Sequence, residues 1–200
     1  MKNQRGSDHR RRLQAFSMIR SVRESMQRFE LEHVIRACGE IADDDEFIII
    51  GSQAILGQFP NAPLNLLMSM ETDIYPKNMP DQADKIDGNI GEGSRFHATH
   101  GYYAQGVGPG TAVLPQGWQD RLLPVKNENT NGNTGLCLEV HDLAISKLVA
   151  SRSKDTEFVS ALVYHEMISH GTMLQRLSAT ELTNSEHSRI KFRIDSIFDR

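Results

Sequence analysis

Two acidic side chains lie two residues apart in a short stretch that has the composition of a β-strand. The stretch spans residues 69–76 and contains Glu71 and Asp73, which alternate with apolar or small side chains. Because alternate side chains of a strand share a face, both carboxylates are expected to point to the same side of a sheet. Two carboxylates at this spacing repel each other unless a cation lies between them. The pair therefore predicts a site for a hard divalent cation such as Mg²⁺.

A glycine–serine pair precedes this stretch. Residues 47–50 form a continuous apolar run that is typical of a buried strand, and the run stops at Gly51 and Ser52. Gly51 lets the backbone turn tightly and approach a ligand, and Ser52 is a common helix N-cap before the helical residues 53–56. A strand that leads through such a turn into a helix predicts an anion site. Together, the turn and the acid pair favour Mg²⁺-dependent nucleotidyl transfer.

These motifs also have simpler explanations. The acid pair could lie on a solvent-facing strand and be ordinary surface charge. Ser52 is not part of a Gly-x-Ser-x-Gly elbow, so the sequence does not indicate a nucleophile there. His97 and His100 have a metal-like spacing but lack a third ligand nearby, so a zinc site is not expected.

Helices and strands are expected to alternate around these motifs. Apolar periodicity predicts a first helix over residues 29–42. Strands are expected over residues 47–50, 69–76, 102–107, 111–114, 121–125 and 136–140, with the third and fourth paired as a hairpin. Later helices are expected over residues 142–151, with Asp142 as N-cap, from Asp155 to a stop at His170-Gly171, and near the C-terminus. Arg121 is expected to pair with a buried acid.

Composition limits the class of protein. The chain has 200 residues, a net charge of −4 and two cysteines in unrelated contexts. The charge argues against a protein that coats nucleic acid through bulk charge, and the cysteines suggest no disulfide framework. No apolar run is long enough to cross a membrane, so we expect a cytoplasmic protein without a membrane partner. The oligomeric state is not indicated.

The chain is expected to have three parts. Residues 1–28 form a basic N-terminal extension, which is expected to be poorly ordered. The alternative is an arm that contacts the phosphates of RNA or DNA. Residues 29–170 form the main domain, and residues 171–200 form a helical C-terminal tail.

The order of the motifs resembles the nucleotidyltransferase superfamily of polymerase-β type. Residues 142–150 with residues 154–158 are similar to the Asp-Leu-x-x-x-Lys-Leu…Arg/Lys-Asp block of the toxin component of type IV toxin–antitoxin (abortive-infection) systems. A closer resemblance is to a bacterial family of uncharacterised nucleotidyltransferase-like domains, whose members carry stretches similar to residues 51–56, 101–109, 114–118 and 141–144. It covers roughly residues 29–170. The implied fold class is α/β (α+β): a small mixed sheet flanked by helices, with a helical C-terminal part.

The resemblance implies roles for both motifs. Gly51 and Ser52 match the pair that holds the triphosphate of an NTP, and Glu71 and Asp73 match the paired metal ligands. One or two Mg²⁺ ions would bridge the phosphates and neutralise developing charge. The first acid of the pair is more commonly aspartate, so Glu71 is a departure from the pattern.

The resemblance also extends to later residues. Lys147, Lys154 and Asp155 match the downstream basic and acidic block, in which the lysines would contact phosphates. A third acid is expected on a later strand, and Glu139 in its apolar surroundings is the best candidate. The alternatives are a surface ion pair for Glu139, solvated helix charges for both lysines and a helix cap for Asp155.

The predicted reaction moves a nucleoside monophosphate from an NTP to a hydroxyl of RNA, protein or a small molecule. A toxin would have a cognate antitoxin as a functional partner. The alternative is a catalytically silent module that binds nucleotide or another protein. An active enzyme should bring Glu71, Asp73 and Glu139 together beside Gly51 and Ser52, whereas a silent module should keep the turn and separate the acids.

Overall fold

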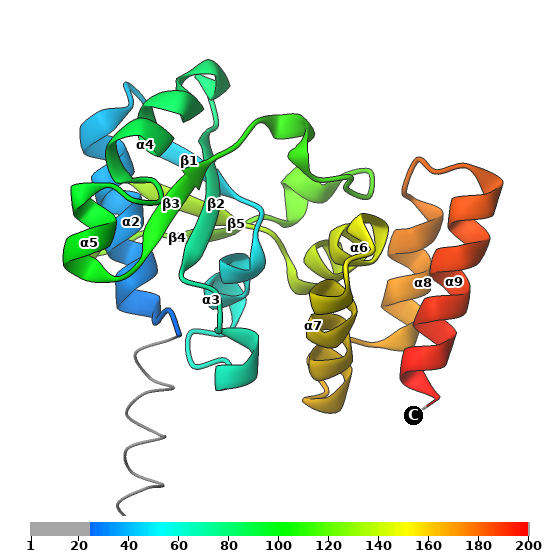
Figure 1. Ribbon diagram of the computed structural model, residues 1–200. Helices are drawn as coiled ribbons and strands as arrows, with labels where there is room; N and C mark the ends of the chain where they lie inside the picture. Colours follow the sequence, from blue (N-terminus) through cyan, green and yellow to red (C-terminus); the bar gives the residue numbers. More distant parts are fainter. Residues whose placement is uncertain (1–24, 200) are drawn as a thin grey trace, which may run out of the picture.

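The computed structural model describes residues 25–199, which form a small sheet with helices packed against it and a neighbouring group of C-terminal helices (Figure 1). The strands are β1 (Glu46–Ile49), β2 (Glu71–Pro76), β3 (Tyr103–Gly106), β4 (Leu123–Val125) and β5 (Thr134–Cys137). The α-helices are α2 (Arg28–Ile41), α3 (Ile55–Gln58), α4 (Ala83–Ile90), α5 (Arg95–His100), α6 (Val140–Ala150), α7 (Ser153–Tyr164), α8 (His170–Ser178) and α9 (Asn184–Phe198). The predicted α/β (α+β) class, with a mixed sheet and a helical C-terminal part, is confirmed.

Within residues 25–199 the strands form one five-stranded sheet in the order β3-β2-β1-β5-β4. β1 is antiparallel to β2 and parallel to β5, while β3 is parallel to β2 and β4 is antiparallel to β5. Parallel neighbours need a long crossover connection, and α4 and α5 supply it between β2 and β3. The two predicted motifs therefore lie on adjacent central strands, with the turn after β1 next to the acid pair on β2.

Helices α2 and α4 pack on one face of the sheet (Figure 1). On β2, Thr72 and Ile74 are fully buried, and the hydroxyl of Thr72 contacts the sulfur of Met26 just before α2 (3.3 Å). Because side chains alternate along a strand, Glu71 and Asp73 point to the opposite face. Burial of Thr72 and Ile74 thus directs both acids away from α2 and α4.

The remaining helices form a group beside the sheet (Figure 1). α6 follows β5 directly, α7 and α8 pack against α6, and α9 packs against all three. Their contacts are made by buried apolar side chains, among them Leu143, Leu148, Leu162, Met173 and Ile194. The part of the chain predicted as a tail over residues 171–200 contains α9 and most of α8.

The predicted hairpin and the predicted helix stop are wrong. Residues 111–114 do not form the second strand of a hairpin, because Pro109 begins a short 3₁₀ helix, η4 (Pro109–Thr111), and β3 pairs in parallel with β2 instead. This pairing buries Ala104 completely. The helix stop expected at His170-Gly171 is instead the start of α8, where the hydroxyl of Ser169 accepts a hydrogen bond from Thr172 N (3.3 Å).

Most of the predicted N-terminal extension lies outside the described residues. Of its members, Arg28 begins α2 and forms an ion pair with Glu32 (Nε to Oε1, 2.9 Å). Across residues 25–199, none of the helices has the length and apolar character needed to cross a membrane.

Candidate active site

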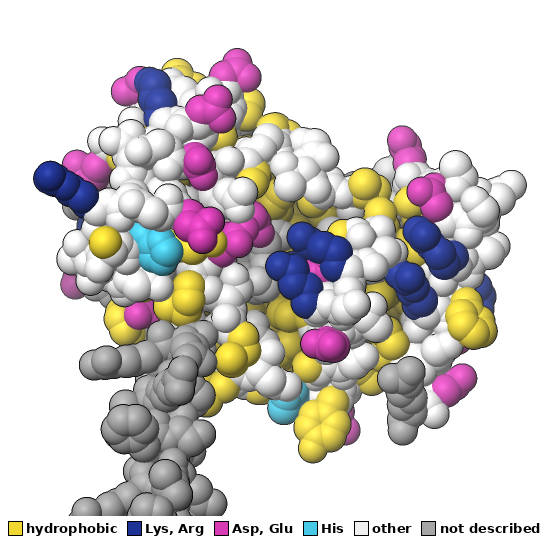
Figure 2. All heavy atoms as spheres, in the orientation of Figure 1, with side chains coloured by type: hydrophobic (Ala, Val, Ile, Leu, Met, Phe, Trp, Pro, Cys, Tyr) yellow, Lys and Arg dark blue, Asp and Glu magenta, His cyan; other side chains and the backbone are white. Residues whose placement is uncertain are grey.

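A cavity of about 310 Å³ lies where the open face of the sheet meets the end of α6 and the start of α7. Figure 2 shows acidic side chains on the sheet side of a hollow and Lys and Arg side chains across from them. The predicted site residues that line this cavity are Gly51, Ser52, Glu71, Asp73, Lys147 and Lys154. Asp155 lines only an adjoining cavity of about 480 Å³, and Glu139 lines neither.

The glycine of the turn is required by the close approach of Asp73. A β-carbon at Gly51 would overlap Asp73 Oδ2, and Ile50 N donates a hydrogen bond to Asp73 O (3.1 Å). The buried Gln53 donates from Nε2 to the carbonyl of Ser69 just before β2 (2.5 Å). These contacts make the turn and the acid pair one packed unit.

The two carboxylates are electrostatically strained. Burial, followed by the nearby charge of Glu71, raises the pKa of Asp73 to about 6. The positive charges of Lys147 and Arg152 act in the opposite direction. A cation between the carboxylates would relieve the same repulsion.

A hydrogen bond from a residue of the neighbouring strand, β3, holds the side chain of Glu71 in place. The hydroxyl of Tyr103 donates a hydrogen bond to Glu71 Oε2 (3.3 Å). Burial and then the charge of Glu71 raise the pKa of Tyr103 to about 12, so the hydroxyl keeps its proton and remains a donor. The ring of His97 in α5 lies against that of Tyr103, with 4.7 Å between centroids.

The opposite wall is basic and is organised by Asp155. Its carboxylate lies 3.4 Å from Lys147 Nζ and 2.7 Å from Arg152 Nε. Burial raises the pKa of Asp155, but the hydrogen bond from Arg152 and the charge of Lys147 outweigh burial and hold it below its ordinary value. Asp155 therefore positions two cations that line the cavity. The exposed Lys154 also lines the cavity but forms no ion pair with another residue in the range 25–199.

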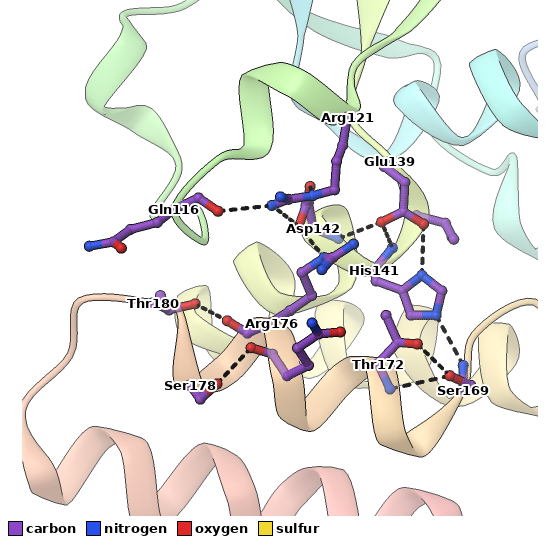
Figure 3. A network of polar contacts seen from close by, with 12 residues as sticks. Gln116, Arg121, Glu139, His141, Asp142, Ser169, Thr172, Arg176, Ser178 and Thr180 are labelled. Atoms are coloured by element: carbon purple, nitrogen blue, oxygen red, sulfur yellow. Dashed lines mark hydrogen bonds and ion pairs between the residues drawn. The ribbon is translucent and has the colours of Figure 1, made fainter.

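The sequence predicts that Glu139 joins the acid pair, but among residues 25–199 the structure does not group it with that pair. β5 ends at Cys137, and Glu139 is the N-cap of α6. Its carboxylate accepts a hydrogen bond from His141 N (3.0 Å) and lies 2.7 Å from His141 Nδ1 (Figure 3). The side chain is turned toward its own helix because capping satisfies otherwise unpaired N–H groups.

Asp142 is fully buried beside this cap. Arg121, in the 3₁₀ helix η5 (Trp118–Arg121), contacts both of its carboxylate oxygens (2.8 and 3.0 Å), and Arg176 Nε of α8 lies 3.1 Å from Oδ1 (Figure 3). The expected pairing of Arg121 with a buried acid is confirmed, whereas the expectation that Asp142 is the helix cap is wrong. The network ties η5, α6 and α8 together.

Glu71 and Asp73 fit a magnesium ion that arrives with phosphates. No group of three His, Cys, Asp or Glu side chains within residues 25–199 is placed to hold a metal. Mg²⁺ commonly uses only one or two protein carboxylates, with waters and substrate phosphates completing an octahedral shell. The hard oxygen donors of the acid pair, beside a turn with close backbone approach, suit that arrangement.

Three residues at the site were missed by sequence reasoning. Gln105 of β3 lines the cavity, Tyr103 holds Glu71, and Arg152 lies on the basic wall. The alternation of β3 was visible, but the wrong hairpin assignment hid its pairing with β2. Nothing in the local sequence distinguishes Arg152 from a solvated charge.

The chain matches a known protein family. Residues 27–196 match the family described as nucleotidyltransferase of unknown function (DUF6036). The chain belongs to this family, which supports a general role in nucleotidyl transfer, and the match includes α8 and nearly all of α9. Comparisons with curated proteins and with solved structures gave no match.

Glu71→Gln should lower the pKa of Asp73 from about 6 toward its ordinary value near 4, because one of the causes of the rise is removed. A ¹³C carboxyl NMR titration would measure this. The exposed Glu92→Gln serves as the matched control and should leave the pKa in place. An unchanged pKa in Glu71→Gln would show that the two carboxylates do not interact.

The same substitution should change the pH dependence of stability. The pKa of Asp73 is higher in the folded chain than in the unfolded chain, so its contribution is most favourable below about pH 4 and is lost as the pH rises through about 6. Urea unfolding across this range should show a shallower loss in Glu71→Gln than in the wild type.

Asp142→Ala should destabilise the protein by about 3 kcal/mol or more, because two arginines lose their buried partner. The control is Lys77→Ala, which removes the partly exposed ion pair with Glu46 (2.8 Å) and should cost less than about 1 kcal/mol. Urea denaturation would compare them. Equal losses would mean that the Asp142 network does not hold the helices in place.

Proposed function

We propose that this protein is a Mg²⁺-dependent nucleotidyltransferase that moves a nucleoside monophosphate from an NTP to a hydroxyl group. The observation that carries the proposal is the cavity of about 310 Å³, which joins an acid pair, a glycine–serine turn and a basic wall. Family membership supports the general reaction. In the reaction, the oxygen of the acceptor hydroxyl forms a bond to the α-phosphorus of the NTP. The bond between the α-phosphorus and the oxygen that bridges to the β-phosphate breaks, and pyrophosphate leaves. A carboxylate or water takes the proton of the hydroxyl.

Glu71 and Asp73 are the residues that would hold Mg²⁺. The ion, when bound, supplies charge neutralisation and Lewis-acid polarisation of the phosphates. Tyr103 keeps Glu71 in place, and the packing against Gly51 keeps Asp73 in place. The proposal therefore needs no large rearrangement of the acid pair.

The phosphates would lie between the turn and the basic wall. The first hydrogen bond of the short helix after Gly51 runs from Ala54 N to Gly51 O. The N–H groups of Ser52 and Gln53 therefore have no acceptor within that helix and are available to an anion. Lys147, Arg152 and Lys154 line the other side of the cavity and would compensate the triphosphate charge. Asp155 already holds Lys147 and Arg152 in place. Part of the loss of side-chain entropy is therefore met before the nucleotide binds.

The acceptor hydroxyl would belong to RNA, protein or a small molecule. The resemblance of residues 142–158 to a toxin component supports the narrower proposal of a toxin with a cognate antitoxin. Within that block, Lys147 and Lys154 line the cavity, whereas Asp142 forms buried ion pairs, so the lysines are the part that supports a shared site.

A silent nucleotide-binding module is the second candidate. The observation that favours it is that Glu139 caps α6, so that within residues 25–199 no third carboxylate joins Glu71 and Asp73. Against it, the acid pair is neither separated nor covered by apolar side chains, since both carboxylates line the cavity with Gly51 and Ser52.

Isothermal titration of the four NTPs, with and without Mg²⁺, would test the proposal. Wild type should bind at least one NTP only with Mg²⁺, and Asp73→Asn should weaken this binding at least about tenfold, or about 1.4 kcal/mol, because a metal ligand is lost. Glu139→Gln is the matched control and should bind within about twofold of wild type. Removing Mg²⁺ with EDTA should abolish binding.

Other outcomes separate the candidates. Binding that ignores both Mg²⁺ and Asp73 would overturn the enzyme proposal in favour of a silent binder.

Where binding depends on Mg²⁺ and on Asp73, transfer would be followed with NTPs labelled at the α- or γ-phosphate, incubated with total RNA or with the protein itself. Label should enter the acceptor from the α-position only, and transfer from the γ-position would mean a kinase instead.

A further inference from the structure

A second cavity, of about 480 Å³, adjoins the first cavity, which holds the acid pair. Four residues line both cavities: Ser52, Ser69, Lys147 and Lys154. They belong to the turn after β1, the approach to β2 and the basic wall. Under the proposed function, the second cavity therefore begins where the phosphates of an NTP would lie.

The first cavity is small for a whole NTP. Its volume of about 310 Å³ lies at the lower end of the range of ligand pockets, which is roughly 300–1,000 Å³. Since a triphosphate and its cation would fill part of this volume, the nucleoside would extend beyond it. Ser69, which lines both cavities, precedes Glu71 by two residues, or roughly 7 Å of extended chain. A nucleoside whose α-phosphate lies at the acid pair would therefore reach the second cavity.

Part of the lining of the second cavity suits a flat, apolar group. It is formed by Leu66, Met68, Phe158 and Ala161. Phe158 is partly exposed, and Lys147 Nζ of the basic wall lies 5.7 Å from the centroid of its ring. Aromatic side chains bind nucleobases by stacking. A purine buries more apolar surface than a pyrimidine, so this lining favours a purine.

The polar lining suits a neutral group rather than further phosphates. The two shared lysines are balanced by two acids, Asp155 and Glu157, which also line the second cavity. The exposed Asn65 adds an amide, and its Oδ1 accepts a hydrogen bond from His165 Nε2 (3.3 Å). Ligand pockets typically combine an apolar lining with a few polar groups of this kind.

We infer that the second cavity is the nucleoside subsite of the NTP, with Phe158 as the platform for the base and a preference for purines over pyrimidines. This inference rests on the proposed function and names its substrate class. Phe158 is a specificity-determining residue, because it lines the second cavity and not the first, where the acid pair lies.

The test is isothermal titration of ATP, GTP, CTP, UTP and inorganic tripolyphosphate, each with Mg²⁺. Wild type should bind ATP and GTP at least about threefold more tightly than CTP and UTP, because a purine stacks over a larger area. Phe158→Ala should weaken the binding of ATP and GTP at least about tenfold, because the platform is lost. It should leave the binding of tripolyphosphate within about twofold of wild type, because tripolyphosphate has no base.

Two variants serve as controls. Phe158→Tyr keeps an aromatic ring and should bind ATP and GTP within about twofold of wild type. Phe192→Ala removes a ring of α9 that is 73% exposed and lines neither cavity, and it should leave every affinity unchanged. Circular dichroism shows whether each variant folds. If Phe158→Ala does not fold, Phe158→Leu, which keeps apolar volume without a ring, takes its place.

The outcomes separate this inference from the proposed function. Wild type that binds NTPs without preferring purines, or a folded Phe158→Ala that binds ATP and GTP like wild type, overturns the inference and leaves the proposed function standing. Equal losses for NTPs and tripolyphosphate in Phe158→Ala also overturn the inference, because the change then lies in the phosphate site. Wild type that binds neither NTPs nor tripolyphosphate with Mg²⁺ overturns the proposed function, and the inference with it.

Discussion

The repulsion between Glu71 and Asp73 is the constraint on which the site depends. Both carboxylates lie on one face of β2, and Asp73 is pressed against the backbone at Gly51. Among the described residues that line the cavity, the positive side chains are Lys147, Arg152 and Lys154, which all belong to α6, α7 or their connection. The sheet supplies negative charge and the helical group supplies positive charge, so the site is complete only when the two parts are packed correctly.

Ion pairs around the buried carboxylates of Asp142 and Asp155 hold the helical group together and tie it to the segment before β4. Asp142 binds Arg121 from the segment between β3 and β4 and Arg176 from α8, while Asp155 orients Lys147 and Arg152. Burying charges in this way costs desolvation, and an apolar network of similar shape would often be as stable. Ion pairs add a fixed orientation of the charged side chains. A site that joins opposite charges from two parts of a fold requires such an orientation.

Local sequence patterns predicted the turn, the acid pair and their faces because these depend on neighbouring residues. The apolar run before Gly51 and the alternation around Glu71 are sufficient for that. Two features depended on more distant information. Glu139 was misplaced because β5 ends two residues earlier and the chain then caps a helix, a boundary that alternation cannot locate. Gln105 was missed because the parallel pairing of β3 with β2 spans two helices and competes with a plausible local hairpin.

That no third carboxylate of the described residues joins the acid pair bears on how the proposed site would work more than on whether it is active. Two carboxylates are enough for Mg²⁺ when phosphates provide further oxygens. A third acid would bind the ion more tightly but would add to a charge that already raises the pKa of Asp73 to about 6. A neutral Gln105 avoids that cost, and the triphosphate, which brings its own charge to the basic wall, would complete the metal shell. Under the proposed function, nucleotide and cation would bind as one ligand, and each would bind poorly without the other.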